Sequence, residues 1–284
     1  MWLCVERDEI IGDPSAHQQV KRVISKISQR EKIKTRFIHR ENITLDLFLD
    51  ADFIITLGGD GTFLTTALHI FDDTPILGVA TNPTSEAFLL KTTALSIQET
   101  IEAFLKDKLQ PVVLPRVKVK GRKLQAVNEI YFGRDHAYKT LDYSLRTSQS
   151  QSWDPQRSFG CIVATGLGST AGYGSLTQGD FFDPLCKELR FTISGPSLRG
   201  RSPTIKKGVI KQGEKLYIRN ETPHDTILSF DSNVELPVQY KEEIVITLSD
   251  QPLYVIEPGL EIARRKELSK KYESVWKTNK MIND

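Results

Sequence analysis

Length, composition and charge describe an ordinary globular chain and exclude several classes of protein. Of its 284 residues, 39% are hydrophobic and 26% are charged, and the net charge of +2 gives no large basic field for nucleic acid or an anionic membrane. The three cysteines form no CxxC pair, so we expect no zinc site and no disulfide framework, but reduced thiols in the cytoplasm. No signal peptide, transit peptide or membrane-spanning apolar run is evident.

The first part of the chain alternates strand-like and helix-like segments. Short apolar runs predict strands, at residues 2–6, 35–39, 52–56 and 75–81. Amphipathic stretches predict helices, one capped by Ser15, one starting near Thr62 and one at 95–107. Alternation of this kind predicts a doubly wound α/β domain with a parallel sheet, which we assign to residues 1–110.

From about residue 111 the pattern changes to apolar/polar alternation between turn residues, which is typical of half-buried antiparallel strands. We therefore expect an all-β domain over 111–257, in the form of a β-sandwich. The remaining tail, 258–284, is highly charged and helix-like, and we expect it to pack back on the first domain.

The stretch "ITLGGDGTFLTTA" (55–67) joins a strand to a helix through a glycine turn that contains Asp60. Glycines let backbone amides approach phosphate oxygens, and the start of the helix attracts an anion. A carboxylate there is unfavourable beside phosphates unless it binds Mg²⁺ or takes a proton from an attacking hydroxyl. The alternative is a tight turn in which Asp60 caps the helix. The turn matches neither a Walker A sequence nor GxGxxG.

Two later stretches carry polar groups between apolar segments. Asn128 offers a donor and an acceptor and an ionised Glu129 offers acceptors, which suit ribose hydroxyls and a purine edge. The stretch "IVATGLGSTAGYGS" (162–175) is rich in small residues, so that its backbone can approach a flat ring closely. A plain turn and an ordinary glycine-rich loop are the alternatives.

In this order the three stretches resemble the NAD kinase family, and the resemblance covers residues 50–175 well. GGDGT alone is also similar to the loops of diacylglycerol kinases, sphingosine kinases and phosphofructokinases. The resemblance implies that Asp60 is the catalytic base. It implies phosphate or nucleotide binding by the residues of the turn, Gly58, Gly59, Gly61, Thr62 and Phe63. It implies dinucleotide binding by residues of the two later stretches, Asn128, Glu129, Thr165, Gly168, Ser169, Thr170, Ala171 and Tyr173.

The chain departs from the common family pattern at several positions. "TNPTSEAFL" (81–89) is similar to the mitochondrial-type branch of the family. The segment usually written T-P-T-G-S-T-A-Y has Gly166 and Leu167 at its second and third positions and an additional Gly172 before the tyrosine. Phe159 stands where the family usually has an aspartate that helps hold the nicotinamide end, and the frequent D-G-Q appears as 231–233, Asp-Ser-Asn.

The resemblance implies an enzyme that phosphorylates the 2′-hydroxyl of the adenosine ribose of NAD to give NADP. ATP or polyphosphate is the expected phosphoryl donor. Because the sequence offers no dedicated metal cage, we expect Mg²⁺ to arrive with the nucleotide. A homodimer or homotetramer assembled through the β domain is expected. Two alternatives stay open: an NAD(P)-binding sensor with weak or no catalysis, and a lipid kinase of the same superfamily.

Overall fold

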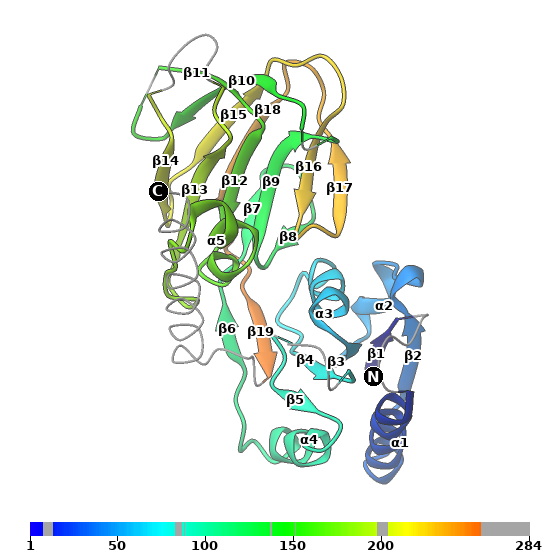
Figure 1. Cartoon of the computed structure of the whole chain (residues 1–284). Helices are drawn as coiled ribbons and strands as arrows, with labels where there is room; N and C mark the ends of the chain where they lie inside the picture. Colours follow the sequence, from blue (N-terminus) through cyan, green and yellow to red (C-terminus); the bar gives the residue numbers. More distant parts are fainter. Residues whose placement is uncertain are drawn as a thin grey trace, which may run out of the picture. The chain divides into compact units, whose positions relative to one another are not determined.

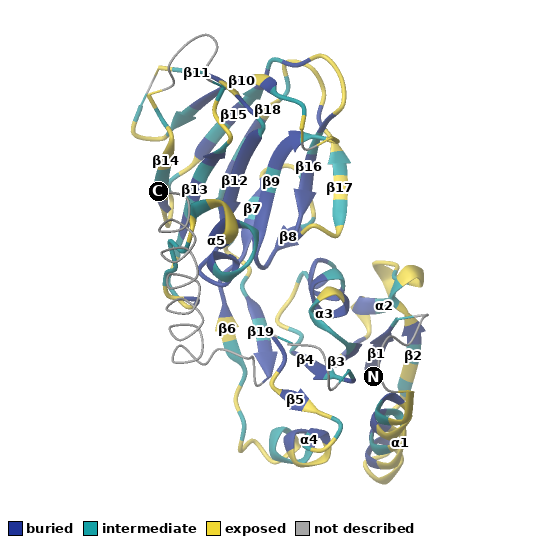
Figure 2. Ribbon diagram, in the orientation of Figure 1, coloured by how far each residue is buried: buried dark blue, intermediate teal, exposed yellow. Residues whose placement is uncertain are grey.

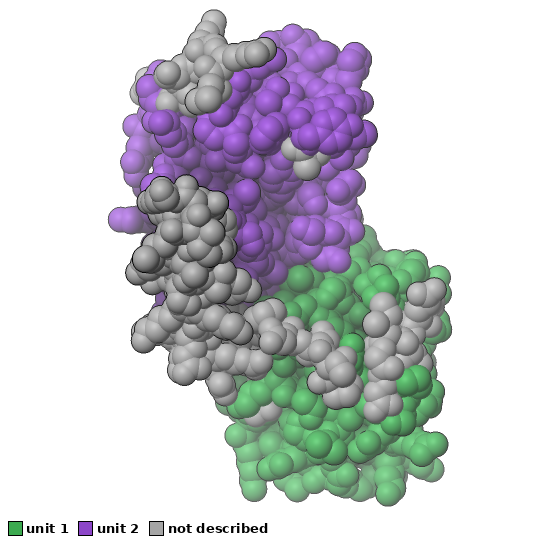
Figure 3. All heavy atoms as spheres, viewed as in Figure 1, with its two compact units in different colours: residues 1–114, 251–260 green, residues 115–250, 261–284 purple. Residues whose placement is uncertain are grey.

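The computed structural model of the chain describes residues 1–7, 14–82, 87, 89–136, 138–150, 152–197 and 204–256. These residues form two compact units (Figure 1, Figure 3). The first unit contains Met1–Leu114 and the strand that follows Gln251, and the second contains Pro115–Asp250. The expected fold class, an α/β unit joined to a β-rich unit, is confirmed.

A seven-stranded sheet forms the centre of the first unit, in the order β2-β1-β3-β4-β19-β6 with β5 paired to β4. The strands are β1 (Trp2–Glu6), β2 (Thr35–His39), β3 (Phe53–Gly58), β4 (Ile76–Ala80), β5 (Thr92–Thr93), β6 (Val112–Leu114) and β19 (Leu253–Ile256). Every pairing is parallel except that of β19 with β6. The central strands are buried along almost their whole length (Figure 2), which is why their sequences are continuous apolar runs.

Helices connect these strands and cover the sheet. They are α1 (Pro14–Arg30), α2 (Asp46–Leu49), α3 (Asp60–Ala67) and α4 (Ile97–Leu105), together with the short 3₁₀-helix η1 (Arg40–Asn42). In the ranges that the structure describes, none of the helices is long and apolar enough to cross a membrane.

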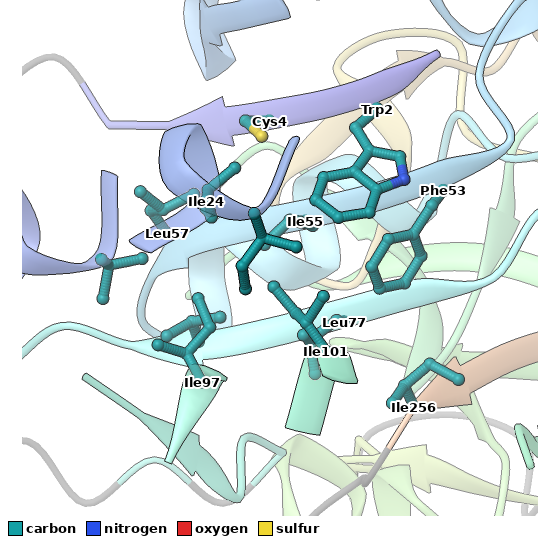
Figure 4. Packing of buried hydrophobic residues seen from close by; sticks show 13 residues of the cluster. Trp2, Cys4, Ile24, Phe53, Ile55, Leu57, Leu77, Ile97, Ile101 and Ile256 are labelled. Atoms are coloured by element: carbon teal, nitrogen blue, oxygen red, sulfur yellow. The ribbon is translucent and has the colours of Figure 1, made fainter. Parts of the chain in front are cut away.

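One apolar cluster holds the first unit together (Figure 4). The buried faces of α1 and α4 contribute Ile24 and Ile101, which pack with side chains of β1, β3 and β4 such as Ile55. The rings of Trp2 and Phe53 meet edge to face, with their centroids 5.8 Å apart. Full burial of each such side chain stabilises the folded state by about 1.5–3 kcal/mol. The cluster therefore holds α1 and α4 against the sheet.

Two six-stranded antiparallel sheets make up the second unit, in the orders β11-β10-β15-β18-β7-β8 and β14-β13-β12-β9-β16-β17. The first contains β7 (Val117–Val119), β8 (Gln125–Ala126), β10 (Leu141–Thr147), β11 (Asp154–Ser158), β15 (Leu216–Asn220) and β18 (Glu243–Leu248). The second contains β9 (Glu129–Arg134), β12 (Gly160–Ala164), β13 (Glu188–Ser194), β14 (Lys207–Lys211), β16 (Thr226–Phe230) and β17 (Val234–Pro237). A 3₁₀-helix, η2 (Gly168–Thr170), leads into α5 (Gly172–Thr177), which packs against β12 and β13.

Two segments assigned to the sandwich from the sequence pair in the first sheet. Val112–Leu114 and Leu253–Ile256 lie antiparallel to each other there, and the division between the units falls between Leu114 and Pro115 rather than at residue 110. Strands of three or four residues are too short for their alternation to indicate which sheet they join. The predicted tail, 258–284, lies outside the described residues.

Candidate active site

The glycine turn of the first unit lies at a reversal in the strand order of the sheet. The chain passes from β1 to β2 on one side and then to β3 on the other side of β1, so the carboxyl ends of β1 and β3 flank a topological switch point. Ligands of open α/β sheets bind at such points. β3 ends at Gly58 and α3 begins at Asp60, so the turn 58–60 opens at this edge.

The helix begins at Asp60, two residues before the predicted start. Gly59 is its N-cap, and the carbonyl of Gly59 accepts hydrogen bonds from the backbone N–H groups of Thr62 (3.1 Å) and Phe63 (3.3 Å). Thr62 and Phe63 are both buried. These two predicted nucleotide-binding residues therefore shape the turn from inside, and Gly59 occupies the cap position that the alternative interpretation gave to Asp60.

The glycines of the turn are needed for different reasons. A Cβ atom at Gly58 would lie 2.7 Å from the Thr62 hydroxyl oxygen, so packing within the chain excludes a side chain there. A Cβ atom at Gly59 would meet nothing within 4 Å. Packing in the described chain does not require glycine at position 59, and a bare backbone open to an approaching anion accounts for it.

Asp60 is half-buried, and one of its carboxylate oxygens accepts a hydrogen bond from the backbone N–H of Leu89 (3.1 Å). Its place in the first turn of α3 puts it beside the partial positive charge of the helix start. The loop after β4 thus fixes the carboxylate beside the open backbone of Gly59. The rest of the 81–89 segment, which resembles the mitochondrial-type branch, lies mostly outside the described residues.

In the second unit, Asn128 and Glu129 lie at the start of β9 over a buried carboxylate. The Asp231 carboxylate accepts hydrogen bonds from the backbone N–H groups of Val127 (2.8 Å), Asn128 (2.7 Å) and Glu129 (3.0 Å). These bonds fix the backbone on both sides of the Asn-Glu pair. From the sequence, Asp231 is only part of an altered D-G-Q and has no assigned role. In the structure Asp231 and Ser232 have positive φ angles of 50° and 55° and form the turn after β16.

Two oxygen atoms of the pair are buried without a hydrogen-bond partner in the part of the chain that the structure describes. They are Oδ1 of Asn128 and Oε2 of Glu129. The other oxygen of Glu129 accepts a long hydrogen bond from the N–H of Gly172 (3.3 Å). An unsatisfied buried polar group costs about 1–3 kcal/mol, so a hydrogen-bonding group placed beside these two atoms would be stabilising.

Burial changes the protonation of both carboxyl groups. It raises the pKa of Glu129 to about 8, and the negative charge of Asp231 adds to the rise, which the N–H of Gly172 only partly offsets. Burial also raises the pKa of Asp231 to about 6, against the three backbone N–H groups and the positive charge of buried Arg116. Glu129 was expected to be ionised, but with a pKa of about 8 it is mostly protonated at pH 7 in the folded chain and can donate a hydrogen bond.

The loop that follows β12 packs directly on the Asn-Glu pair. The hydroxyl of Thr165 donates to the carbonyl of Val127 (2.6 Å). A Cβ atom at Gly168 would lie 2.2 Å from the carbonyl oxygen of Asn128, so only glycine allows the two backbones to come this close. The hydroxyls of Ser169 and Thr170 donate to carbonyls of the same loop, at 2.6 Å and 3.1 Å. The hydroxyl of Thr165 therefore holds the loop against the pair, and the hydroxyls of Ser169 and Thr170 hold the shape of the loop itself.

Tyr173 is the anchor of this loop. Its ring is 1% exposed, packs with Ile162 and Ala164, and its hydroxyl donates to Asp180 (2.9 Å). Asp180 also pairs with Arg190 of β13 at 2.8 Å. Tyr173 thus lies in the packed interior between α5 and the sheet, and Ala171 lies half-buried just before α5.

Phe159, which stands in place of the family's usual aspartate, lies just before β12 and is half-buried. Its carbonyl accepts a hydrogen bond from the hydroxyl of Tyr131 (2.8 Å). Tyr131 follows Glu129 by two residues and so shares its face of β9. This hydrogen bond joins β9 to the residue before β12 through the hydroxyl of Tyr131, which is uncharged at neutral pH.

The chain is similar in sequence and in fold to known kinases. A family model described as the ATP-NAD kinase N-terminal domain matches residues 8–109, which include the glycine turn. The chain is 27% identical over 263 residues to a probable NADH kinase of Oryza sativa subsp. japonica, covering 84% of this chain and 80% of that protein.

Residues 8–109 therefore match the NAD kinase family, and similarity to relatives of that family extends over most of the chain. Two solved structures show that the NAD kinase fold extends over almost the whole chain. The NAD kinase of Archaeoglobus fulgidus in complex with ATP superposes with a TM-score of 0.73 at 24% identity, covering 96% of this chain and 99% of that one. Yeast NADH kinase in complex with NADH gives a TM-score of 0.72 at 15% identity, covering 90% and 83%.

Proposed function

We propose that this kinase transfers the terminal phosphoryl group of ATP, or of polyphosphate, to the 2′-hydroxyl of the adenosine ribose of NAD or NADH. The observation that carries the proposal is the Asp60 carboxylate, held by the N–H of Leu89 beside the open backbone of Gly59 at the switch point of the sheet. The names of its relatives, an NADH kinase and kinases solved with ATP and with NADH, support the choice of substrates.

In the proposed reaction the ribose oxygen forms a bond to the γ-phosphorus, and the bond from that phosphorus to the bridging oxygen breaks, releasing ADP. Asp60 takes the proton that the hydroxyl loses. A base in this role typically contributes 10²–10⁴-fold to the rate. The remaining acceleration comes from positioning and from neutralising the phosphate charge, for which the turn 58–61 supplies backbone N–H groups and the start of α3.

We assign the nucleotide to the first unit, Met1–Leu114 with the strand that follows Gln251, and the dinucleotide to the second unit, Pro115–Asp250. Within the second, the partnerless oxygens of Asn128 and Glu129 are the atoms assigned to the ribose hydroxyls and the purine edge. A protonated Glu129 donates one hydrogen bond and accepts another, which matches a sugar hydroxyl in either role. The loop residues from Thr165 to Tyr173 then act by holding this pair in place.

The donor set at the turn fits a magnesium ion that comes with the nucleotide. Mg²⁺ is usually held by one or two carboxylates together with substrate phosphates, and Asp60 is such a carboxylate. In the described ranges no group of three His, Cys, Asp or Glu residues could form a complete cage. When bound, Mg²⁺ neutralises the phosphate charge.

A second candidate is an NAD(P)-binding sensor with weak or no catalysis. It is favoured by the inward contacts of Thr165, Ser169 and Tyr173, which leave fewer side chains for the dinucleotide than the family resemblance implies. The substitution of Phe159 for an aspartate favours it too. A homodimer or homotetramer and a cytoplasmic location stay predictions from the sequence.

The deciding experiment is a screen of the purified protein with ATP or polyphosphate as donor and NAD or NADH as acceptor, with Mg²⁺, in which NADP or NADPH is measured. Asp60→Asn should lower turnover by at least about 10²-fold with dinucleotide binding retained. Asp73→Asn, at an exposed position of the same unit, is the matched control and should leave turnover unchanged. Dinucleotide binding without any turnover in the wild type would favour the sensor, and full activity of Asp60→Asn would reject Asp60 as the base.

A further inference from the structure

A buried polar cluster lies at the same edge of the first sheet as the glycine turn. Glu6 is the last residue of β1 and pairs in register with Leu57 of β3, directly before Gly58. His17 projects from α1, and Thr81 follows the last residue of β4. Glu6, His17 and Thr81 are only 6%, 3% and 4% exposed. The cluster therefore lies behind the turn, at the switch point between β1 and β3.

A series of hydrogen-bond contacts connects the cluster to the glycine turn. Lys21 donates to both carboxylate oxygens of Glu6, at 2.8 Å and 3.0 Å. The Nε2 atom of His17 lies 2.7 Å from Oε2 of Glu6, and its Nδ1 atom lies 3.5 Å from the hydroxyl oxygen of Thr81. The backbone N–H of Thr81 donates to the carbonyl of Gly58 at 3.1 Å.

The charges of this cluster are costly in a packed interior. Burial raises the pKa of Glu6, but the hydrogen bonds from Lys21 and His17 outweigh it, so that the pKa is below its ordinary value and the carboxylate is ionised at neutral pH. A buried ion pair generally contributes no more to stability than apolar side chains of the same volume. Stability alone therefore does not explain the cluster, whereas its connection to the glycine turn through Thr81 does.

We propose that His17, oriented by Glu6, is a positioning residue for phosphate binding: it holds Thr81, and through Thr81 it holds the carbonyl of Gly58 at the entrance of the turn. With its Nε2–H donated to Glu6, the imidazole presents Nδ1 as an acceptor for the Thr81 hydroxyl. This orients the Thr81 backbone and keeps the N–H groups of the turn in the direction of the phosphates. The proposal rests on the proposed function, because it assumes that the turn binds the phosphates of ATP.

Replacing His17 by asparagine or by glutamine separates its two contacts. An asparagine amide occupies the place of Nδ1 and keeps the contact with Thr81, whereas a glutamine amide occupies the place of Nε2 and keeps the contact with Glu6. The loss of one net hydrogen bond corresponds to about fivefold in affinity. We therefore expect His17→Gln to raise the dissociation constant of Mg-ATP, measured by calorimetry, about fivefold, and His17→Asn to stay within about twofold of the wild type.

Thr81 supplies a second pair of variants that leaves the buried charges in place. Thr81→Val keeps the shape and the backbone N–H but removes the hydroxyl, and Thr81→Ser restores it. We expect the valine variant to lose about fivefold in Mg-ATP affinity and the serine variant to regain it. The Michaelis constant for the dinucleotide should change less than twofold in all four variants, because Asn128 and Glu129 belong to the other unit.

Hydrogen exchange of the free protein tests the positioning without any ligand. The amides of residues 57–63 should exchange several-fold faster in His17→Gln and Thr81→Val than in their partner variants, with no change in β12. Unchanged exchange in this segment would overturn the proposal whether or not the protein is a kinase, and so would equal losses of ATP and dinucleotide affinity in all four variants. A wild type that forms no NADP or NADPH would refute the proposed function alone, and the exchange result would still decide the role of His17.

Discussion

Replacing Glu129 by glutamine should stabilise the protein at neutral pH although it removes a charged residue type from the candidate site. The side chain is 6% exposed and its pKa is raised to about 8 from an ordinary value of 4.5. In the unfolded chain the carboxyl group ionises in water above pH 4.5, whereas in the folded chain it stays protonated up to about pH 8. The folded state therefore binds more protons, and this group makes stability fall as the pH rises through that window.

The magnitude follows from the two pKa values. Each unit of difference corresponds to about 1.4 kcal/mol. Integrated between pH 5 and pH 7, ionisation of the unfolded state lowers the stability of the wild type by roughly 2–3 kcal/mol. Glutamine has the same shape and does not ionise, so this loss is absent in Glu129→Gln. The difference in stability between variant and wild type should thus shift by roughly 2–3 kcal/mol in favour of the variant over this range.

Urea denaturation at pH 5, 6 and 7, followed by circular dichroism, measures this difference. Protonation of Asp231 affects both proteins, so its effect largely cancels when the two are subtracted. Glu235→Gln is a suitable control, since Glu235 lies exposed on β17 in the same sheet and its charge stays in water. A stability difference that does not change with pH would show that Glu129 is ionised in the folded protein, and the reasoning from burial would then be refuted.

Two further predictions concern ligand binding. Asn128→Ala removes the partnerless Oδ1 atom and should raise the Michaelis constant for the dinucleotide roughly tenfold while changing that for ATP little; equal changes in steady-state assays would argue that Asn128 does not touch the acceptor. Gly59→Ala meets no atom of the described chain, so it should weaken ATP binding without lowering the melting temperature, whereas Gly58→Ala, which collides with Thr62, should lower the melting temperature. Calorimetry measures the ATP affinity of the two glycine variants and thermal melts measure their melting temperatures. Equal melting temperatures would contradict the different reasons given for the two glycines.

The sequence predicted the parts of the fold that carry strong local signals. The buried strands β1, β3 and β4 lie within two residues of their predicted limits, because continuous apolar runs between turn residues allow few other structures. The glycine turn was predicted from the local order of residues, since three glycines around an aspartate between a strand and a helix are typical of a tight turn. Helix limits were less accurate: α3 begins at Asp60 because its cap is a glycine, which lacks the usual polar side-chain signal.

Other features depend on contacts between residues far apart in the chain. Asp231 lies more than a hundred residues after the amides of 127–129 that it binds, and no local pattern links them. The raised pKa of Glu129 follows from its burial beside that carboxylate, which alternation along β9 does not reveal. Hydroxyls such as that of Thr165 can bind a ligand or their own backbone with equal chemical ease, and only the folded loop distinguishes the two.

The antiparallel pairing of β6 with β19 has a consequence for how this chain can be taken apart. The chain leaves the first sheet at Leu114 and re-enters it at Gln251, and Leu114 pairs directly with Leu253. In topological terms, Pro115–Asp250 is an insert between the two arms of a hairpin. Replacing residues 115–252 by a two-residue Asn-Gly turn would connect Leu114 directly to Leu253 and should leave a self-contained α/β module. The same junction is a natural place to graft a different β domain onto the phosphate-loop half.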